Sequence, residues 1–268
     1  MMKYYIVDAF TDKRFHGNPA GVCLPERFPS EETMQQIAAE NNLSETAFVV
    51  KGENGYDLRW FTPTTEVDLC GHATLASAFV VSHFLDIGIS HMDFHTKSGR
   101  LSVTKSGDLF EMDFPSRKPE KIALTACMEE AIGAPVLEAH QSRDTLLLVE
   151  SEGQVRNLRL DFDLLAKLSD TLSPVVTAKG VIVTAKGDSA DFVSRFFAPG
   201  AGILEDPVTG SAHSTLIPFW AERLGKSKMT AKQLSKRGGT LYCEHRGERV
   251  KISGKAVLYL QGELFVDG

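Results

Sequence analysis

Three short motifs that recur in the same order in both halves of this chain limit its fold more than any other feature. The matched pairs are Arg59-Trp60-Phe61-Thr62-Pro63 with Arg195-Phe196-Phe197-Ala198-Pro199, Cys70-Gly71-His72-Ala73 with Thr209-Gly210-Ser211-Ala212, and Thr96-Lys97-Ser98-Gly99 with Ser235-Lys236-Arg237-Gly238. Gly71 and Gly99 are 28 residues apart, and so are Gly210 and Gly238. Three matches in one order with one preserved interval indicate a duplicated structural unit.

Each copy of the repeat combines strand-forming segments with one largely apolar helix, which predicts an α+β fold with strands around a central helix. We expect residues 1–115 to form the first half and residues 116–255 the second, with the boundary near Pro115-Ser116. The tail, residues 256–268, has no clear counterpart in the first copy. It is therefore free to return to the first half and complete that half's sheet.

The two central helices are both predicted to begin at a glycine, Gly71 in the first copy and Gly210 in the second. A glycine at such a start lets a ligand approach the backbone closely. The first N–H groups and the positive end of the helix dipole then favour an anion. If the halves face each other, both helix starts converge on one cleft, which predicts a site for a small carboxylate-bearing substrate.

Composition and charge exclude several classes of function. The chain is 43% hydrophobic and 24% charged, with a formal net charge of -6. It has no long basic run, so we expect neither nucleic acid nor an anionic membrane as a partner. It also lacks an apolar run long enough to span a membrane, and its first residues are typical of a strand rather than a signal peptide. We therefore expect a cytoplasmic globular protein.

The cysteines and histidines show no metal-ligand spacing. The four cysteines, Cys23, Cys70, Cys127 and Cys243, are scattered, which favours a reducing compartment, no disulfide framework and no zinc site. His91 and His95 are four residues apart, but they fall in a predicted strand, where they lie too far apart to share an ion. We expect no bound metal.

A set of motifs spread from the N-terminus to about residue 220 resembles the PhzF-like phenazine-biosynthesis isomerase family. The motifs are Asp8-Ala9-Phe10-Thr11, Gly17-Asn18-Pro19-Ala20, Asn42-Leu43-Ser44-Glu45-Thr46-Ala47-Phe48, Cys70-Gly71-His72-Ala73-Thr74 and Glu205-Asp206-Pro207-Val208-Thr209-Gly210-Ser211-Ala212-His213. The resemblance implies the diaminopimelate-epimerase fold, in which two pseudo-symmetric halves each roll a mixed β-sheet around a central helix. It also implies proton-transfer chemistry without a cofactor, and a homodimer.

The resemblance also implies roles for individual residues. The family's acid/base carboxylate falls on Glu45, its substrate-positioning histidine on His72, its aspartate on Asp206 and its serine on Ser211. Other expected substrate contacts are Asn18 and the backbone at the two helix starts, namely Gly71, Ala73, Gly210 and Ala212. Related epimerases use two facing cysteines, whereas this chain has Cys70 in the first slot and Thr209 in the second. A two-thiol racemase mechanism is therefore disfavoured.

Each candidate also has a structural interpretation. Glu45 could be a surface acid entering a strand, Asn18 and Asp206 could serve only their turns, and His213 is expected to be structural. Cys70 and His72 are two residues apart, and such neighbours do not face each other on a helix, so we expect Cys70 to be a buried structural thiol. Pro218 lies inside the second predicted helix, where it should kink the helix or remove one hydrogen bond.

These observations favour a cofactor-independent isomerase in which Glu45 moves a proton between carbons of the substrate. In this hypothesis Asp206 and His72 hold polar substituents and polarise the substrate. One alternative is an amino-acid racemase or epimerase that uses Cys70. Another is a non-catalytic binding protein on the same fold, and a more distant one is a Cys–His hydrolase.

Overall fold

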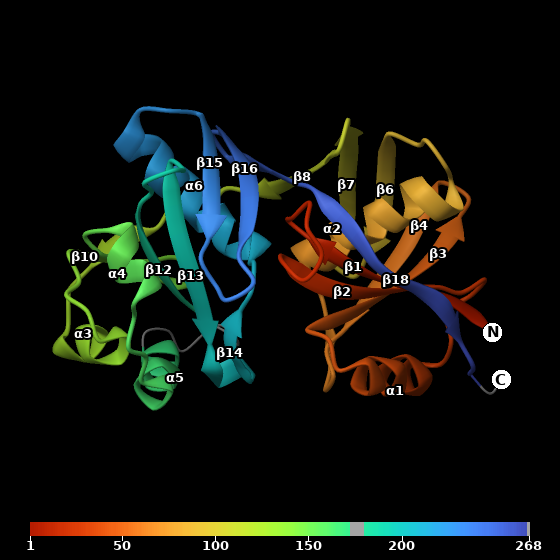
Figure 1. Ribbon diagram of the computed structural model, residues 1–268, viewed down its shortest axis with the longest axis horizontal. Helices are drawn as coiled ribbons and strands as arrows, with labels where there is room; N and C mark the ends of the chain where they lie inside the picture. The colour runs from red at the N-terminus through yellow and green to blue at the C-terminus, as the bar shows by residue number, and fades with distance from the viewer. Residues whose placement is uncertain (172–179, 267–268) are drawn as a thin grey trace. The chain divides into compact units, whose positions relative to one another are not determined.

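The computed structural model describes residues 1–171 and 180–266, and the chain divides into two compact units. The first unit comprises Met1–Asp113 together with the C-terminal segment from Ser253 onward, and the second comprises Phe114–Ile252. Both units contain mixed β-sheet and few helices (Figure 1). The chain therefore has the α+β architecture that its sequence predicts. None of the helices within the described residues is long and apolar enough to cross a membrane.

The first unit is a mixed sheet in which the C-terminal strand pairs with the N-terminal one. Its strands are β1 (Met2–Ala9), β2 (Asn18–Leu24), β3 (Glu45–Gly52), β4 (Gly55–Phe61), β5 (Glu66–Val67), β6 (His91–Thr96), β7 (Gly99–Ser106), β8 (Leu109–Pro115) and β18 (Ala256–Leu264). They pair in the order β18–β1–β2–β3–β4–β6–β7–β8, and β5 pairs with the end of β4. The β2–β3 and β4–β6 pairs are parallel, and the others are antiparallel.

The central helix of the first unit is α2 (Gly71–Val80), which a π-helical turn, η1 (Val81–Leu85), extends. All residues of α2 except Gly71 and Phe79 are buried, and the helix contacts β1, β2 and β3 (Figure 1). A helix that is apolar on every side is stable only inside a protein. Its buried hydroxyls bond to the preceding turn, since Thr74 Oγ1 donates to the Cys70 carbonyl and Ser77 Oγ to the Ala73 carbonyl.

Helix α1 (Glu31–Asn41) covers the outer side of this sheet, and a capping residue stands at each of its ends. Ser30 caps its N-terminus by accepting a hydrogen bond from the Thr33 N–H, and Asn42 ends it in the left-handed conformation with φ of 48°. Met34 and Ala38 face inward against Met2, Tyr4, Cys23, Phe48 and Phe61, which form a small core. This core holds together the four strands β1, β2, β3 and β4, which present the candidate site.

The second unit repeats the pairing pattern of the first. Its strands are β9 (Glu120–Ile122), β10 (Glu138–Gln141), β11 (Thr145–Leu148), β12 (Val181–Lys186), β13 (Phe192–Ala198), β14 (Ile203–Asp206), β15 (Lys228–Gln233), β16 (Gly239–Arg246) and β17 (Arg249–Gly254). From β10 the order is β10–β11–β12–β13–β15–β16, with alternate antiparallel and parallel pairs. The strands β1–β2–β3–β4–β6–β7 have the same alternation, which confirms two pseudo-symmetric halves.

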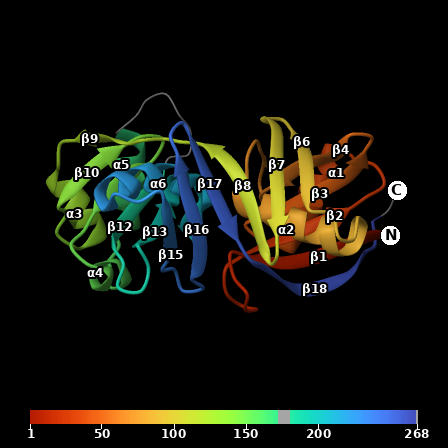
Figure 2. The ribbon, with the colours of Figure 1, turned by 90° about the horizontal axis from the view of Figure 1, so that it is seen from above.

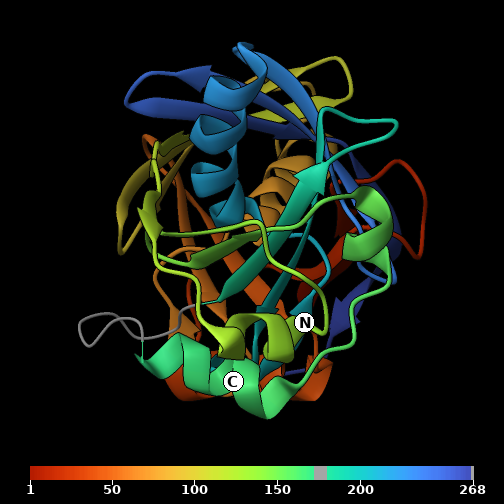
Figure 3. The ribbon, with the colours of Figure 1, turned by 90° about the vertical axis from the view of Figure 1, so that its left-hand side faces the viewer.

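Helices α3 (Ala126–Ile132), α4 (Glu152–Arg156) and α5 (Phe162–Thr171) lie outside the second sheet, and α6 (Gly210–Leu224) is its central helix. Figure 3 looks onto this unit and shows α3 beside α5, two helices that are in contact. Asp161 precedes α5, and its Oδ1 accepts a hydrogen bond from the Leu164 N–H, as expected for a capping residue. The core between these helices and the sheet contains Met128, Ile132, Leu147, Val155, Leu165, Val183 and Phe197.

The repeat also extends to one ion pair in each unit. Arg59 on β4 donates from Nε and Nη2 to Glu66 at 2.7 and 2.8 Å, and Arg195 on β13 donates from the same atoms to Glu205 at 2.7 and 2.9 Å. Both carboxylates lie on the short strand that leads to the central helix. A two-pronged arginine–carboxylate contact fixes direction as well as distance, so each pair orients the segment that precedes its central helix.

Pro218 lies inside α6, where it removes one helical hydrogen bond, as its sequence predicts. The carbonyl left without its helical donor is that of Ser214, four residues earlier. The backbone N–H of Arg117 donates to this carbonyl at 2.9 Å, and the neighbouring Ser116 N–H donates to the Glu248 carbonyl. The proline therefore creates the point at which the segment after β8 attaches to α6. Figure 2 shows β16 and β17, the two strands on either side of the turn that contains Glu248, side by side.

Candidate functional site

The first candidate site lies where α2 begins. Cys70 is the residue before the helix, and its backbone is extended, with φ of −143° and ψ of 110°. Its side chain therefore does not follow the helical spacing, and Sγ lies 3.5 Å from Nδ1 and 4.0 Å from Nε2 of His72. The expectation that these two side chains would not face each other is wrong, because it treated Cys70 as part of the helix.

Glu45 is the first residue of β3 and reaches the same histidine. β3 pairs in parallel with β2 and contacts α2, which places the start of the strand beside the start of the helix. Oε2 of Glu45 lies 3.0 Å from Nε2 of His72, and the two side chains are only 12% and 6% exposed. Among the described residues, no donor is well aligned with this oxygen. A buried carboxylate oxygen with an open lone pair can accept a proton.

Asn18 holds the opposite side of the histidine ring. It is the first residue of β2, is fully buried, and its side-chain amide lies 3.2 Å from Nδ1 of His72. The ring is thus held between the amide on one nitrogen and the carboxylate on the other. Asn18 therefore orients His72, a role that the sequence does not distinguish from direct substrate contact.

Burial and charge set the protonation of this cluster. Burial lowers the pKa of His72, but the negative charges on Cys70 and Glu45 outweigh it and raise that pKa well above its usual value. Burial, with the Glu45 charge, raises the pKa of the Cys70 thiol to about 11, although His72 and the Ala73 N–H act in the opposite direction. The Glu45 carboxylate, 3.0 Å from Nε2 of His72, contributes to both shifts.

The second candidate site lies at the corresponding place in the second unit, where β14 leads to α6. Thr209 precedes α6 with an extended backbone, as Cys70 precedes α2. Its hydroxyl donates to Oδ2 of Asp206 at 2.5 Å. Gly210 and Ala212 are buried, whereas Ser211 is partly exposed in the first turn. The second unit thus gathers the other predicted residues: Asp206, Gly210, Ser211 and Ala212.

Gln233 completes this second group and was not predicted from the sequence. It ends β15, is 1% exposed, and its Oε1 accepts a hydrogen bond from the Thr209 N–H at 2.8 Å. Its Nε2 donates to the Asp206 carbonyl at 2.8 Å and to Thr209 Oγ1 at 3.1 Å. The repeat aligns Gln233 with the buried Phe94. That replacement of an aromatic residue by a buried amide was the signal available in the sequence.

His213, in the first turns of α6, makes a hydrogen bond that stabilises the start of this helix. It is fully buried, and its Nδ1 lies 2.8 Å from the Thr209 carbonyl, to which it donates. Burial lowers the pKa of His213 to about 4, more than the Thr209 contact raises it. A neutral imidazole with this pKa braces the start of α6 at neutral pH.

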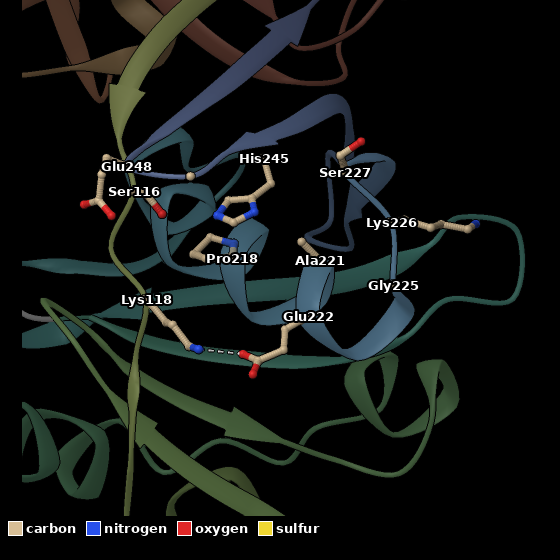
Figure 4. A pocket seen from close by; sticks show the side chains of 11 residues that line it. Ser116, Lys118, Pro218, Ala221, Glu222, Gly225, Lys226, Ser227, His245 and Glu248 are labelled. Carbon is tan, nitrogen blue, oxygen red and sulfur yellow. Dashed lines mark ion pairs between the residues drawn. The ribbon is translucent and has the colours of Figure 1, made fainter.

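A surface pocket of about 730 Å³ lies elsewhere in the second unit (Figure 4). It is bounded by the segment around Ser116 and Lys118, the last turns of α6 and the turn between β16 and β17. Lys118 pairs with Glu222 at 2.8 Å across one side, and both side chains are about two-thirds exposed. None of the predicted site residues lines this pocket, so the candidate chemistry is at the helix starts rather than here.

The chain matches the family model described as phenazine biosynthesis-like protein over residues 7–262. An uncharacterized isomerase of Pseudomonas aeruginosa is 50% identical, with 96% of each chain covered. A crystal structure of a phenazine biosynthesis PhzC/PhzF protein from Clostridium difficile superposes with a TM-score of 0.92 at 52% identity, covering 99% of this chain and 100% of that one. A hydroxyproline epimerase from Agrobacterium vitis shares the fold at 10% identity, with a TM-score of 0.64 and coverage of 97% and 91%.

Proposed function

The chain belongs to the PhzF-like phenazine biosynthesis family and is an isomerase of that family, and we propose that it moves a proton between carbons of a small carboxylate-bearing substrate without a cofactor. The observation that carries this proposal is the Glu45 carboxylate. Its Oε2 is buried, ion-paired with His72 at 3.0 Å, and has no well-aligned hydrogen-bond donor among the described residues. That oxygen can remove a proton from a carbon acidified by conjugation and return it to another carbon.

In this proposal His72 is the electrostatic partner of the base. Its imidazole lies 3.0 Å from the carboxylate that acts as the base. It then lies next to the negative charge that develops on the substrate, and a fixed charge in a buried site stabilises such a transition state. Asn18 contributes by orienting the ring. The backbone N–H groups of Gly71 and its neighbours at the start of α2 favour a carboxylate, although the Ala73 N–H also contacts the Cys70 sulfur.

The residues of the second unit are proposed to bind substrate rather than to move the proton. Asp206 and Ser211 offer polar groups to the substituents of the substrate. The N–H groups at Gly210 and Ala212, at the start of the fifteen-residue helix α6, favour its carboxylate. Gln233 holds the segment between Asp206 and Thr209 by hydrogen bonds to the backbone of both residues.

A second candidate is an amino-acid racemase or epimerase in which Cys70 takes part in proton transfer. The contact between Cys70 Sγ and the His72 ring favours it. The raised pKa of the thiol, about 11, and the hydroxyl of Thr209 in the second slot both oppose it. Inactivation by a thiol reagent in wild type but not in Cys70→Ser, with protection by an amino acid, would support this candidate.

We propose a cytoplasmic homodimer, because four free cysteines suit a reducing compartment and the resemblance implies a dimer. Light scattering on the purified protein measures the oligomeric state. The activity itself is tested by incubating the protein in D₂O with a panel of cyclic and amino carboxylic acids. Deuterium incorporated at carbon identifies the substrate class, and retention of configuration separates an isomerase from a racemase.

A further inference from the structure

The hairpin that follows the central helix of each unit returns to the segment that precedes the same helix. In the first unit this hairpin joins β6 to β7, and Ser98 in its turn donates from Oγ to the Asp68 carbonyl at 2.9 Å. In the second unit it joins β15 to β16, and Ser235 in its turn donates from Oγ to the Pro207 carbonyl at 2.8 Å. Both turns therefore hold a backbone carbonyl that lies just before a helix start.

The two carbonyls occupy equivalent places in their units. Asp68 is four residues before His72. Pro207 is likewise four residues before Ser211. His72 is the proposed partner of the base, and Ser211 is a proposed substrate contact. Because only three residues separate each carbonyl from the side chain concerned, each hairpin is placed to set the position of one functional group.

The turn of the first hairpin is braced and has a second anchor. The Ser98 N–H donates to Thr96 Oγ1 at 3.1 Å, which closes the turn. Lys97, between these two residues, donates from Nζ to Oε2 of Glu66. The turn thus holds the segment before α2 at two points, the Glu66 side chain and the Asp68 carbonyl.

The turn of the second hairpin is closed by Ser235 itself. Its Oγ accepts a hydrogen bond from the Gly238 N–H at 3.0 Å while it donates to the Pro207 carbonyl. Gly238 has a φ of 64°, a conformation that favours glycine. The repeat aligns Ser235 with Thr96 rather than with Ser98. The same contact therefore comes from different positions of the two turns, and comparison of the two halves of the sequence does not reveal it.

We propose that Ser98 and Ser235 are positioning residues, Ser98 for the proton-transfer group of the first unit and Ser235 for the substrate-binding group of the second. This rests on the proposed function, which assigns the base to the first unit. Without the Ser98 hydroxyl the segment before α2 is held less firmly, so His72 is less well placed beside Glu45. Without the Ser235 hydroxyl the segment that carries Asp206 is loosened, and the base is unaffected. One hairpin thus sets mainly the rate and the other mainly the affinity.

The test measures deuterium exchange and substrate affinity separately. The probe is the carboxylic acid that exchanges with wild type in D₂O, and calorimetry gives its dissociation constant. Ser98→Ala should lower exchange at saturating acid by about 3- to 10-fold and change the affinity by less than about twofold, because proton transfer is more sensitive to misplacement than binding is. Ser235→Ala should weaken the affinity by about 3- to 10-fold and leave exchange at saturating acid within about twofold of wild type.

Matched controls separate positioning from a general loss of stability. Ser106→Ala, in the turn between β7 and β8, and Ser227→Ala, before β15, replace exposed serines and should match wild type in both quantities. Ser98→Thr and Ser235→Thr keep the hydroxyl and should also retain wild-type values. Equal losses of exchange and affinity in either alanine variant, or variants that match the controls, overturn the proposal.

Amide hydrogen exchange of the protein without substrate gives a readout that does not depend on activity. Ser98→Ala should raise the exchange rates of the amides of residues 69–72 by about 3- to 10-fold, and Ser235→Ala those of residues 208–211, each without changing the other segment. If wild type incorporates deuterium into no acid, the proposed function is wrong, and these amides still decide whether each serine holds its helix start. If incorporation depends on Glu45 but both serine variants match their controls, the positioning role is wrong and the proposed function stands.

Discussion

Oε2 of Glu45 and Nε2 of His72 lie 3.0 Å apart at the junction of β3 and α2, with both side chains largely withdrawn from solvent. Removal of one partner from a buried ion pair leaves the other charge unpaired and costs about 3–5 kcal/mol. The neutral isostere Glu45→Gln removes the charge while keeping the shape. The pair therefore predicts a strong coupling between the two positions.

His72→Gln should lower the free energy of unfolding at pH 7 by about 3 kcal/mol, because the Glu45 carboxylate stays buried without its cation. In the Glu45→Gln background the same change should cost much less. Urea unfolding of the wild type, both single variants and the double variant measures this coupling. Strictly additive effects would show that the ion pair does not contribute to the folded state.

The lowered pKa of His213 predicts a contribution to stability that is lost in acid. Its folded pKa of about 4 lies below the usual value near 6.5, so the unfolded chain binds a proton more readily. The stabilisation is therefore complete above about pH 6.5 and is lost as the pH falls toward 4, by up to about 3 kcal/mol. The difference in unfolding free energy between wild type and His213→Gln, followed from pH 7 to pH 4, isolates this residue. A difference that does not change with pH contradicts the assignment.

The hydrogen bonds of Gln233 to Thr209 and Asp206 predict that its replacement affects both stability and substrate binding. Gln233→Leu leaves the Thr209 N–H and the Asp206 carbonyl without this partner and should destabilise the protein by about 1–3 kcal/mol. It should also raise KM more than it lowers kcat, since Asp206 is proposed to bind substrate. The matched control is Gln36→Leu at an exposed position of α1, which should stay within about 0.5 kcal/mol of wild type. An unchanged KM in Gln233→Leu would separate this loop from the substrate.

Local sequence signals were sufficient for much of the fold. Ser30, Asn42 and Asp161 mark helix ends because their side chains and backbone preferences act within a few residues. The repeated motifs identified two halves with a central helix in each, and the strand pairing confirms this architecture. The effect of Pro218 on its helix was also foreseeable, but its partner was not, since Arg117 lies 101 residues earlier in the chain.

The candidate site was less accessible to sequence reasoning because its geometry depends on tertiary contacts. The motif positions of Glu45 and His72 were visible, but their 3.0 Å contact follows from the pairing of β3 with β2 beside α2. Cys70 was misjudged because one extended residue before the helix redirects its side chain. The contacts that the buried amides of Asn18 and Gln233 make were not visible in the local sequence, since each acts on a residue more than twenty positions away.

The most direct test of the central claim is solvent deuterium incorporation by Glu45→Gln, with Glu40→Gln at an exposed position of α1 as the control. The substrate is the carboxylic acid that exchanges with wild type in D₂O, and its affinity is measured by calorimetry in parallel. The account predicts that Glu45→Gln binds this acid nearly as wild type but loses exchange by about 10²- to 10⁴-fold, while Glu40→Gln exchanges normally. Wild-type exchange in Glu45→Gln would contradict the assignment of Glu45 as the base.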